Sequence, residues 1–467
     1  MFFYRRFTPG LAIYSYIVGD PEVGRCVVID PTRDVDDYID IAEKEGLVIT
    51  DIMETHVHAD YLCGSKELKH RLGGKPAIHC SGMGGDAWTA KYADNVVKDG
   101  DQIQVGSLRF EAVYSPGHTP EHVMWALYDE QRSKETPWML FTGDLLFVGA
   151  IGRPDLLGAE AQKALSHQLY DTVFNRMPVF PDFTEVYPAH GQGSLCGKAI
   201  GSRDSTTVGY ERQFNTSLIK EEEGVWTKKL LDDMPEAPPY FLRMKKMNVQ
   251  GAPLLGKEFP GNRGINAKEL KQMMDDGAQV LDTRSKESFA ATHIPGSINI
   301  PLAATLSLWA GWVLDYHKPI VLVLDKKEEL KEVVTHLVRI GLDQCIGYLD
   351  GGITAWEDSD QETDRVETLT PKQLHGKLSE YVVLDVRSPG EWSQGHIAGA
   401  IHIPLGVIEE NIDQIPKNKP IAIMCGSGYR ASVAASFLKR NGIDTVTNIL
   451  GGMRGWVADN LPTTSGD

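Results

Sequence analysis

A long internal repeat is the feature that most constrains how this chain can fold. The segment VLDTRSKESFAATHIPGSINIPL, beginning at Val280, returns as VLDVRSPGEWSQGHIAGAIHIPL, beginning at Val383. PIVLVLD returns as PIAIMC, and LDGGITAW returns as LGGMRGW, in the same order. Recurring landmarks of this length indicate the tandem duplication of a whole domain. Each copy has apolar strands, the second running into a helix, which predicts two small parallel α/β domains over 263–360 and 366–464.

The block before the repeat, residues 1–235, has a different organisation. Amphipathic helical stretches such as 34–46 alternate there with apolar, strand-like runs, which predicts a further α/β domain. These runs lie at 13–18, 26–30, 49–55, 139–147 and 185–191. The segment 236–262 is rich in Pro and Gly and weak in periodicity, so we expect a linker there.

Composition excludes several classes of partner. The formal net charge is −17 and is spread along the chain, whereas binding to duplex nucleic acid needs clustered Lys and Arg. No apolar run approaches a membrane span, and the start of the chain has no signal-peptide pattern. The six cysteines lack the paired spacing of disulfide frameworks or structural zinc modules. We therefore expect a cytoplasmic homo-oligomer in which any functional cysteine acts as a thiolate.

Histidines and carboxylates recur in the first block where strand-like runs end. In an extended segment alternate side chains point the same way, so the three motif residues after the run at 49–55 can share one face. The other three follow later strands in turns that contain Gly or Pro, the usual position of site residues. The set is His56, His58, Asp60, His118, Asp144 and His190. One such histidine is weak evidence, but this ordered series predicts a metal site.

With HxHxD, PGHT, TGD and PAHG in that order, the block resembles the metallo-β-lactamase superfamily. The resemblance implies an αββα sandwich for residues 1–235. Two-metal members of the superfamily have a histidine directly after the motif aspartate, whereas this sequence has Tyr61. A phenol is a poor substitute for imidazole on a divalent metal, so we expect one metal ion.

Two histidines and one carboxylate, with the remaining positions open, suit non-haem iron(II) and oxygen chemistry. The block most resembles the persulfide dioxygenases of the superfamily, which implies mononuclear Fe(2+) held by His56, His118 and Asp144. The same resemblance places six residues beside the metal or on the substrate side: His58, Asp60, Tyr61, Arg153, Asp155 and His190. A Zn(2+) hydrolase of the glyoxalase II type is the competing interpretation, and Tyr61 counts against it because that chemistry commonly uses two metals.

A cysteine loop stands between a strand and a helix in the second repeat copy. The run IAIM is followed by Cys425, then Gly426 and Gly428, and then Arg430. Glycines let the loop curl with its amides inward, and these amides, the helix N-terminus and the arginine favour a thiolate or a persulfide anion. The loop and its flanks resemble rhodanese, which implies transfer of sulfane sulfur through Cys425, with Arg430 in the site. The first copy has Asp325 at the corresponding position and is interpreted as a pseudo-rhodanese.

Cys196 follows His190 on a Gly-rich turn, PAHGQGSLCGKAIG. The turn must pass near the predicted metal, and related fusions have a similar cysteine. That resemblance makes Cys196 a candidate sulfur acceptor. The alternative is a small buried residue with no chemical role.

The order of domains resembles bacterial persulfide dioxygenase–rhodanese fusions with two rhodanese copies. The resemblance implies iron-dependent oxidation of a low-molecular-weight persulfide, of glutathione or another thiol, by dioxygen to sulfite and the thiol. Transfer of sulfane sulfur via Cys425 would then make or use thiosulfate. Two alternatives stay open: a zinc-dependent hydrolase with an accessory sulfurtransferase, and a persulfide sensor without turnover. Metal content tests the first alternative, and catalytic oxygen uptake tests the second.

Overall fold

The computed structural model describes residues 1–232, 234–256 and 259–466. The chain divides into two units by its internal contacts. The first unit comprises residues 1–255 and 338–341, and the second comprises residues 256–337 and 342–467. Within the described ranges, no helix combines the length and the apolar character that crossing a bilayer requires.

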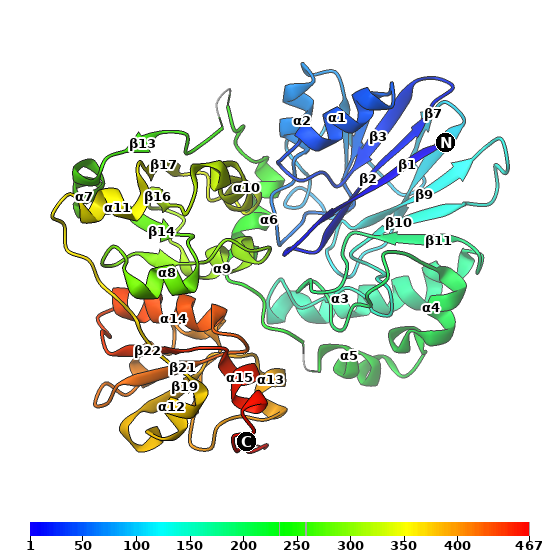
Figure 1. Ribbon diagram of the computed structural model, residues 1–467. Coiled ribbons are helices and arrows are strands. Elements are labelled where there is room, and N and C mark those ends of the chain that lie inside the picture. Colours follow the sequence, from blue (N-terminus) through cyan, green and yellow to red (C-terminus); the bar gives the residue numbers. More distant parts are fainter. Residues whose placement is uncertain (233, 257–258, 467) are drawn as a thin grey trace. The chain divides into compact units, whose positions relative to one another are not determined.

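Two six-stranded sheets form the framework of the first unit (Figure 1). The first sheet has the order β1 (Phe2–Thr8), β2 (Ile13–Asp20), β3 (Arg25–Ile29), β4 (Val48–Met53), β5 (Ala77–Ser81) and β6 (Asn95–Val97). The second has the order β12 (Thr206–Thr207), β11 (Glu185–Pro188), β10 (Met139–Gly143), β9 (Val123–Asp129), β8 (Leu108–Tyr114) and β7 (Gln102–Val105). The expected strand-like runs thus contribute strands to both sheets.

Apolar side chains hold the sheets face to face and attach helices to their outer surfaces. Tyr16 and Val18 of the first sheet pack with Trp125 and Phe141 of the second in one buried cluster. The helices are α1 (Asp36–Lys44), α2 (Ser65–Arg71), α3 (Ala159–Asp171), α4 (Val208–Phe214) and α5 (Glu223–Leu231). Residues of α1 and α2 join a cluster with the first sheet, and residues of α3 and α5 join one with the second. The predicted αββα sandwich is confirmed.

The segment 236–262 contains a helix, α6 (Tyr240–Gln250), that belongs to the first unit. Its Asn248 amide donates hydrogen bonds of 2.8 Å to the backbone oxygens of His58 and Tyr61. Its buried Lys245 donates to the Leu156 carbonyl at 3.1 Å. The prediction of a linker is therefore wrong for this helix, because its polar side chains hydrogen-bond buried backbone groups. Residues 257–258 of the predicted linker lie outside the described ranges.

The second unit contains two five-stranded parallel sheets with the same strand order. The first copy has β13 (Gly264–Ile265), β17 (Cys345–Leu349), β16 (Ile320–Val323), β14 (Gln279–Asp282) and β15 (Ile298–Asn299), with α7 (Ala267–Asp275), α8 (Lys286–Ala291), α9 (Leu306–Val313), α10 (Leu330–Arg339) and α11 (Gly352–Glu357). The second copy has β18 (Glu367–Leu369), β22 (Val446–Ile449), β21 (Ile421–Met424), β19 (Val382–Asp385) and β20 (Ile401–His402), with α12 (Pro371–His375), α13 (Pro389–Ser393), α14 (Tyr429–Arg440) and α15 (Gly452–Ala458). The predicted duplication is confirmed.

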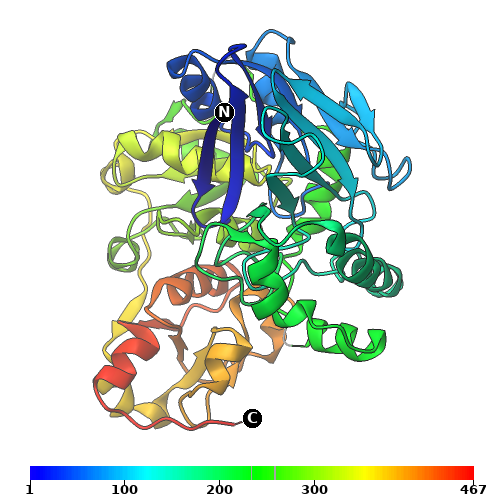
Figure 2. The ribbon, with the colours of Figure 1, turned by 90° about the vertical axis from the view of Figure 1, so that its right-hand side faces the viewer.

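A buried polar bridge joins the two copies where α14 packs against β15. Figure 1 labels α14 next to α8 of the first copy, and Figure 2 shows the two copies from another side. The Ser432 hydroxyl donates to Asn299 Oδ1 at 2.6 Å, and the Asn299 backbone N–H donates to the Ser436 hydroxyl at 2.9 Å. The Tyr429 hydroxyl donates to the Pro301 carbonyl at 2.8 Å. We call these five residues the inter-copy bridge. It ties the helix that follows Cys425 to the copy that has Asp325 in place of this cysteine.

Candidate functional site

Three of the predicted site residues bring ligand atoms together in the first unit. One ligand atom from each of His56, His118 and Asp144 lies within 4.8 Å of the others. Asp144 Oδ2 is 3.7 Å from His56 Nε2 and 3.3 Å from His118 Nε2. All three side chains are buried, and they come from the turns that follow β4, β8 and β10. The sheet order places these turns at one edge of the sandwich.

Hydrogen bonds at the Nδ1 atoms of His56 and His118 orient the two imidazole rings. The Thr55 hydroxyl donates to Asp30 at 2.8 Å, so its oxygen accepts from His56 Nδ1 at 2.9 Å. His118 Nδ1 donates to the Arg153 carbonyl at 2.8 Å. Each ring therefore carries its proton on Nδ1 and leaves the Nε2 lone pair free. Burial lowers the pKa of His118 to about 4, which keeps that ring neutral at physiological pH.

His190 fixes the aspartate of the cluster. Its Nδ1 lies 2.6 Å from Asp144 Oδ1 and its Nε2 lies 2.8 Å from Asp60 Oδ2. Burial alone would lower the pKa of His190, but the two carboxylates outweigh burial and raise it well above its usual range. These contacts hold the Asp144 carboxylate through Oδ1 and leave Oδ2 facing the two imidazoles.

The donor set fits one metal ion. His118 Nε2 and Asp144 Oδ2 are buried and have no hydrogen-bond partner in the described part of the chain. Buried polar atoms rarely stay unsatisfied, and a cation at this point would satisfy both. Two neutral histidines and a carboxylate form the donor set of mononuclear non-haem iron sites. The three residues therefore form a candidate metal site.

A neighbouring cluster contains Asp60, His190 and Cys196, whose ligand atoms also lie within 4.8 Å of one another. His190 lies between the two clusters, since its Nδ1 contacts Asp144 and its Nε2 contacts Asp60. The Tyr61 hydroxyl donates to the Asp30 carbonyl at 3.2 Å. Burial raises the pKa of the Cys196 thiol well above its usual range, so burial favours the thiol over the thiolate there.

The other predicted residues beside the metal cluster have supporting contacts. His58 Nε2 lies 3.1 Å from Asp30 Oδ1. Arg153 forms an ion pair with Asp155 at 2.7 Å, and its side chain donates to the Leu195 and Pro235 carbonyls. These contacts hold Arg153 in place. Because the Arg153 carbonyl accepts a hydrogen bond from His118 Nδ1, they also fix the orientation of the His118 ring.

Asp30 and His122 are not among the site residues predicted above, but both form hydrogen bonds that support the cluster. Asp30 accepts from both the backbone N–H and the hydroxyl of Thr55. His122 Nε2 accepts from the Asp144 backbone N–H at 3.0 Å, and its Nδ1 pairs with the Ser115 hydroxyl at 2.8 Å. A signal for Asp30 existed, because an acidic residue ends the apolar run CVVID directly before a proline.

Cys425 in the second unit lies at the N-terminal end of α14, as the loop predicted. Its side chain is 1% exposed. The backbone N–H groups of Gly428 and Ala431 point at Sγ from 3.1 and 3.4 Å. Gly428 has φ +93, a conformation that favours glycine. Gly452 of α15 packs so closely that an added Cβ would lie 2.2 Å from the Cys425 carbonyl oxygen. The loop is thus built to hold an anionic sulfur.

Arg430 makes a two-pronged ion pair with Glu391, with both N···O distances at 2.6 Å. Burial alone would raise the pKa of Glu391, but the bond to Arg430 outweighs it and lowers this pKa to about 2. The positive charge of Arg430, which the sequence predicted beside Cys425, is therefore largely neutralised by Glu391. In the first copy, Asp325 at the corresponding position is exposed, and no cysteine stands there.

Two family models match the chain. The metallo-beta-lactamase superfamily matches residues 8–190, and the rhodanese-like domain matches residues 266–359 and 370–459. The two matched rhodanese segments correspond to the two repeat copies, and the superfamily segment contains the whole metal cluster.

Three known proteins show how far the similarity extends. "Persulfide dioxygenase ETHE1, mitochondrial" of Bos taurus is 32% identical over 213 residues, which cover 45% of this chain and 74% of that protein. "Hydroxyacylglutathione hydrolase" of Polaromonas sp. (strain JS666) is 27% identical over 265 residues, covering 51% and 94%. A crystal structure of a metallo-beta-lactamase from Staphylococcus aureus subsp. aureus COL has a TM-score of 0.66 and 33% identity, covering 75% of this chain and 98% of that one.

Proposed function

Because the chain belongs to the persulfide dioxygenase family of the metallo-β-lactamase superfamily and carries two rhodanese-like domains, we propose that it oxidises low-molecular-weight persulfides and transfers sulfane sulfur. The first reaction is RSSH + O₂ + H₂O → RSH + SO₃²⁻ + 2 H⁺. The observation that carries the proposal is the convergence of the ligand atoms of His56, His118 and Asp144 in a buried cluster.

These three residues would hold one iron(II) ion, which supplies, when bound, the redox chemistry that lets dioxygen react with a sulfur anion. The residues of the chain prepare the site for that chemistry. Thr55 and Arg153 aim the imidazoles, and burial excludes water from around them. His190 contacts the Asp144 carboxylate at 2.6 Å and fixes its orientation. Cys196, beside this cluster, is our candidate for a sulfur acceptor close to the metal.

At the second site, we propose that Cys425 accepts and donates sulfane sulfur. In the donating step a nucleophile such as sulfite attacks the outer sulfur of the Cys425 persulfide. A bond forms between the nucleophile and that sulfur, the bond from Sγ breaks, and its electron pair stays on Sγ as a thiolate. With sulfite the product is thiosulfate. The N–H groups of Gly428 and Ala431 would stabilise the negative charge on sulfur throughout.

A zinc hydrolase is the second candidate, and the similarity to a hydroxyacylglutathione hydrolase is the observation that favours it. Hydrolases of that type commonly use two metals. Tyr61 favours a single metal instead, because it stands where two-metal members have a histidine and its hydroxyl donates to a backbone oxygen.

Metal analysis with oxygen consumption tests the proposal. We expect about one iron per chain and many turnovers of oxygen uptake on glutathione persulfide, because the cluster holds one complete set of free donors. Two zinc ions per chain, with thioester hydrolysis and no oxygen uptake, would favour the hydrolase. Oxygen uptake that stops after one equivalent would favour a persulfide sensor.

We also expect the two reactions to be coupled. Both sites lie on one chain, and tethering raises the local concentration of an intermediate, to roughly millimolar for short flexible connections. The unmodified enzyme should therefore release thiosulfate from persulfide alone. The Cys425→Ser variant should release mainly sulfite, with oxygen uptake little changed, as measured by chromatography of both anions.

Free sulfite also reacts with persulfide in solution, so thiosulfate must be corrected with an enzyme-free control that receives sulfite. Equal corrected thiosulfate yields from the two proteins would show that the sites act as independent enzymes.

A further inference from the structure

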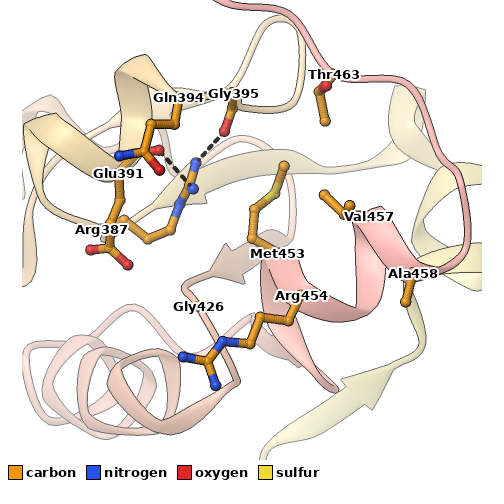
Figure 3. Close-up of a pocket in the computed structure, with 10 residues that line it drawn as sticks. All are labelled: Arg387, Glu391, Gln394, Gly395, Gly426, Met453, Arg454, Val457, Ala458 and Thr463. Atoms are coloured by element: carbon orange, nitrogen blue, oxygen red, sulfur yellow. Dashed lines mark hydrogen bonds between the residues drawn. The ribbon is translucent and has the colours of Figure 1, made fainter.

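A pocket of about 540 Å³ lies beside the Cys425 loop within the second repeat copy (Figure 3). Gly426 of the loop lines it, and α15 contributes Met453, Arg454, Val457 and Ala458. The backbone N–H of Arg454 donates to the Gly426 carbonyl at 3.1 Å, so α15 is anchored on the loop itself. Pockets of roughly 300–1,000 Å³ accept organic molecules of drug size. This pocket therefore offers room for more than a small inorganic sulfur anion.

Three arginines lie in or beside the pocket, and two of them are neutralised. Arg387 pairs with Asp385 at 2.6 Å, and Arg430 pairs with the pocket residue Glu391 at 2.6 Å. Arg454 has no ion pair with any residue that the structure describes. In Figure 3, the Arg454 side chain extends from α15 toward the backbone at Gly426. The pocket therefore presents one uncompensated positive charge, from Arg454.

The inactive copy provides a comparison within the same chain. Trp356 and Trp456 are equivalent, and each indole N–H donates to a backbone oxygen six residues further on, at Glu362 and Pro462. Counted from these tryptophans, Arg454 corresponds to Thr354. The apolar pair Val457 and Ala458 corresponds to Glu357 and Asp358. The copy without the cysteine thus also lacks the arginine, and it carries two acids where the active copy has an apolar wall.

We propose that this pocket binds an anionic organic thiol, with Arg454 recognising its carboxylate and Met453, Val457 and Ala458 contacting its carbon chain. The inference rests on the proposed sulfurtransferase function and names the class of acceptor. The acceptor thiolate attacks the outer sulfur of the Cys425 persulfide, which forms the acceptor persulfide and leaves Sγ as a thiolate. Arg454 is a specificity-determining residue for this step.

The test uses the full-length protein, loaded with sulfane sulfur from thiosulfate and then freed of excess donor. Single-turnover transfer is measured against 3-mercaptopropionate, which carries a carboxylate, and 2-mercaptoethanol, which is uncharged. Arg454→Thr, the residue of the inactive copy, should raise the half-saturating concentration of 3-mercaptopropionate by about fivefold, the size expected for one exposed ion pair. The maximal rate, and transfer to 2-mercaptoethanol, should stay within about twofold. Arg365→Thr removes an exposed arginine away from the pocket and is the charge-matched control.

A second variant, Val457→Glu with Ala458→Asp, gives the active copy the acidic wall of the inactive one. It should weaken binding of 3-mercaptopropionate more than Arg454→Thr does, because two negative charges repel the carboxylate. If both variants keep the wild-type preference between the two thiols, the pocket assignment is wrong while sulfurtransfer stands. If the unmodified protein transfers no sulfur to either thiol, the proposed function itself fails.

Discussion

Replacing Cys425 with serine is expected to abolish sulfurtransferase activity, to below one thousandth of the wild-type rate. A serine hydroxyl in the same ring of amides cannot form a persulfide, so no sulfur can be carried. The measurement is thiocyanate formation from thiosulfate and cyanide. Cys425 is buried, and serine is nearly isosteric, so the variant should keep its fold and its melting temperature.

The matched control is Asp325→Ala in the inactive copy, which should retain nearly full activity because Asp325 is exposed and lies in a loop without a nucleophile. Substantial residual transfer in Cys425→Ser would mean that another thiol carries sulfur. Cys196 would then be the first to test, by the double variant with Cys196→Ser.

Removing a metal ligand is expected to have the second large effect. His118→Ala and Asp144→Ala should each lose bound iron and oxygen uptake, because each removes one of three protein donors. In Asp144→Ala, His190 also loses one of its two carboxylate partners. Iron is measured by elemental analysis after gel filtration, and oxygen uptake with an electrode.

Thiosulfate sulfurtransfer should survive in both variants, since Cys425 belongs to the other unit. His167→Ala removes a histidine whose side chain is 70% exposed, and it controls for the loss of an imidazole in general. Iron that stays bound in His118→Ala and Asp144→Ala would contradict the ligand assignment.

The sequence predicted the architecture because its strongest signals are local and periodic. The repeat predicted the two rhodanese-like domains. The strand-like runs with site residues at their ends predicted the αββα domain. The helix α6 was missed because its buried face mixes Met244 and Phe241 with Lys245 and Asn248. A face of that composition has no clear apolar period, and its hydrogen-bond partners are remote in sequence.

The sequence predicted which residues gather at the site, but not the hydrogen bonds and ion pairs among them. Motif order indicates which side chains approach a metal, whereas the tautomer of His56 depends on Thr55 and Asp30, which only the fold brings together. The charge of Arg430 illustrates the same limit. Its neutralisation by Glu391 depends on the packing of α13 against the loop, which the spacing of the Cys425 motif does not contain.

The inter-copy bridge has a consequence for the persistence of the inactive copy after gene duplication. Loss of the nucleophile in one copy removes no packing, so it carries little penalty in folding free energy. Loss of the whole copy would remove the hydrogen bonds that Ser432 and Ser436 form with Asn299. It would also expose to water the face of α14 on which these two serines lie. The inactive copy thus covers buried polar groups of the active copy, a role that does not need a nucleophile.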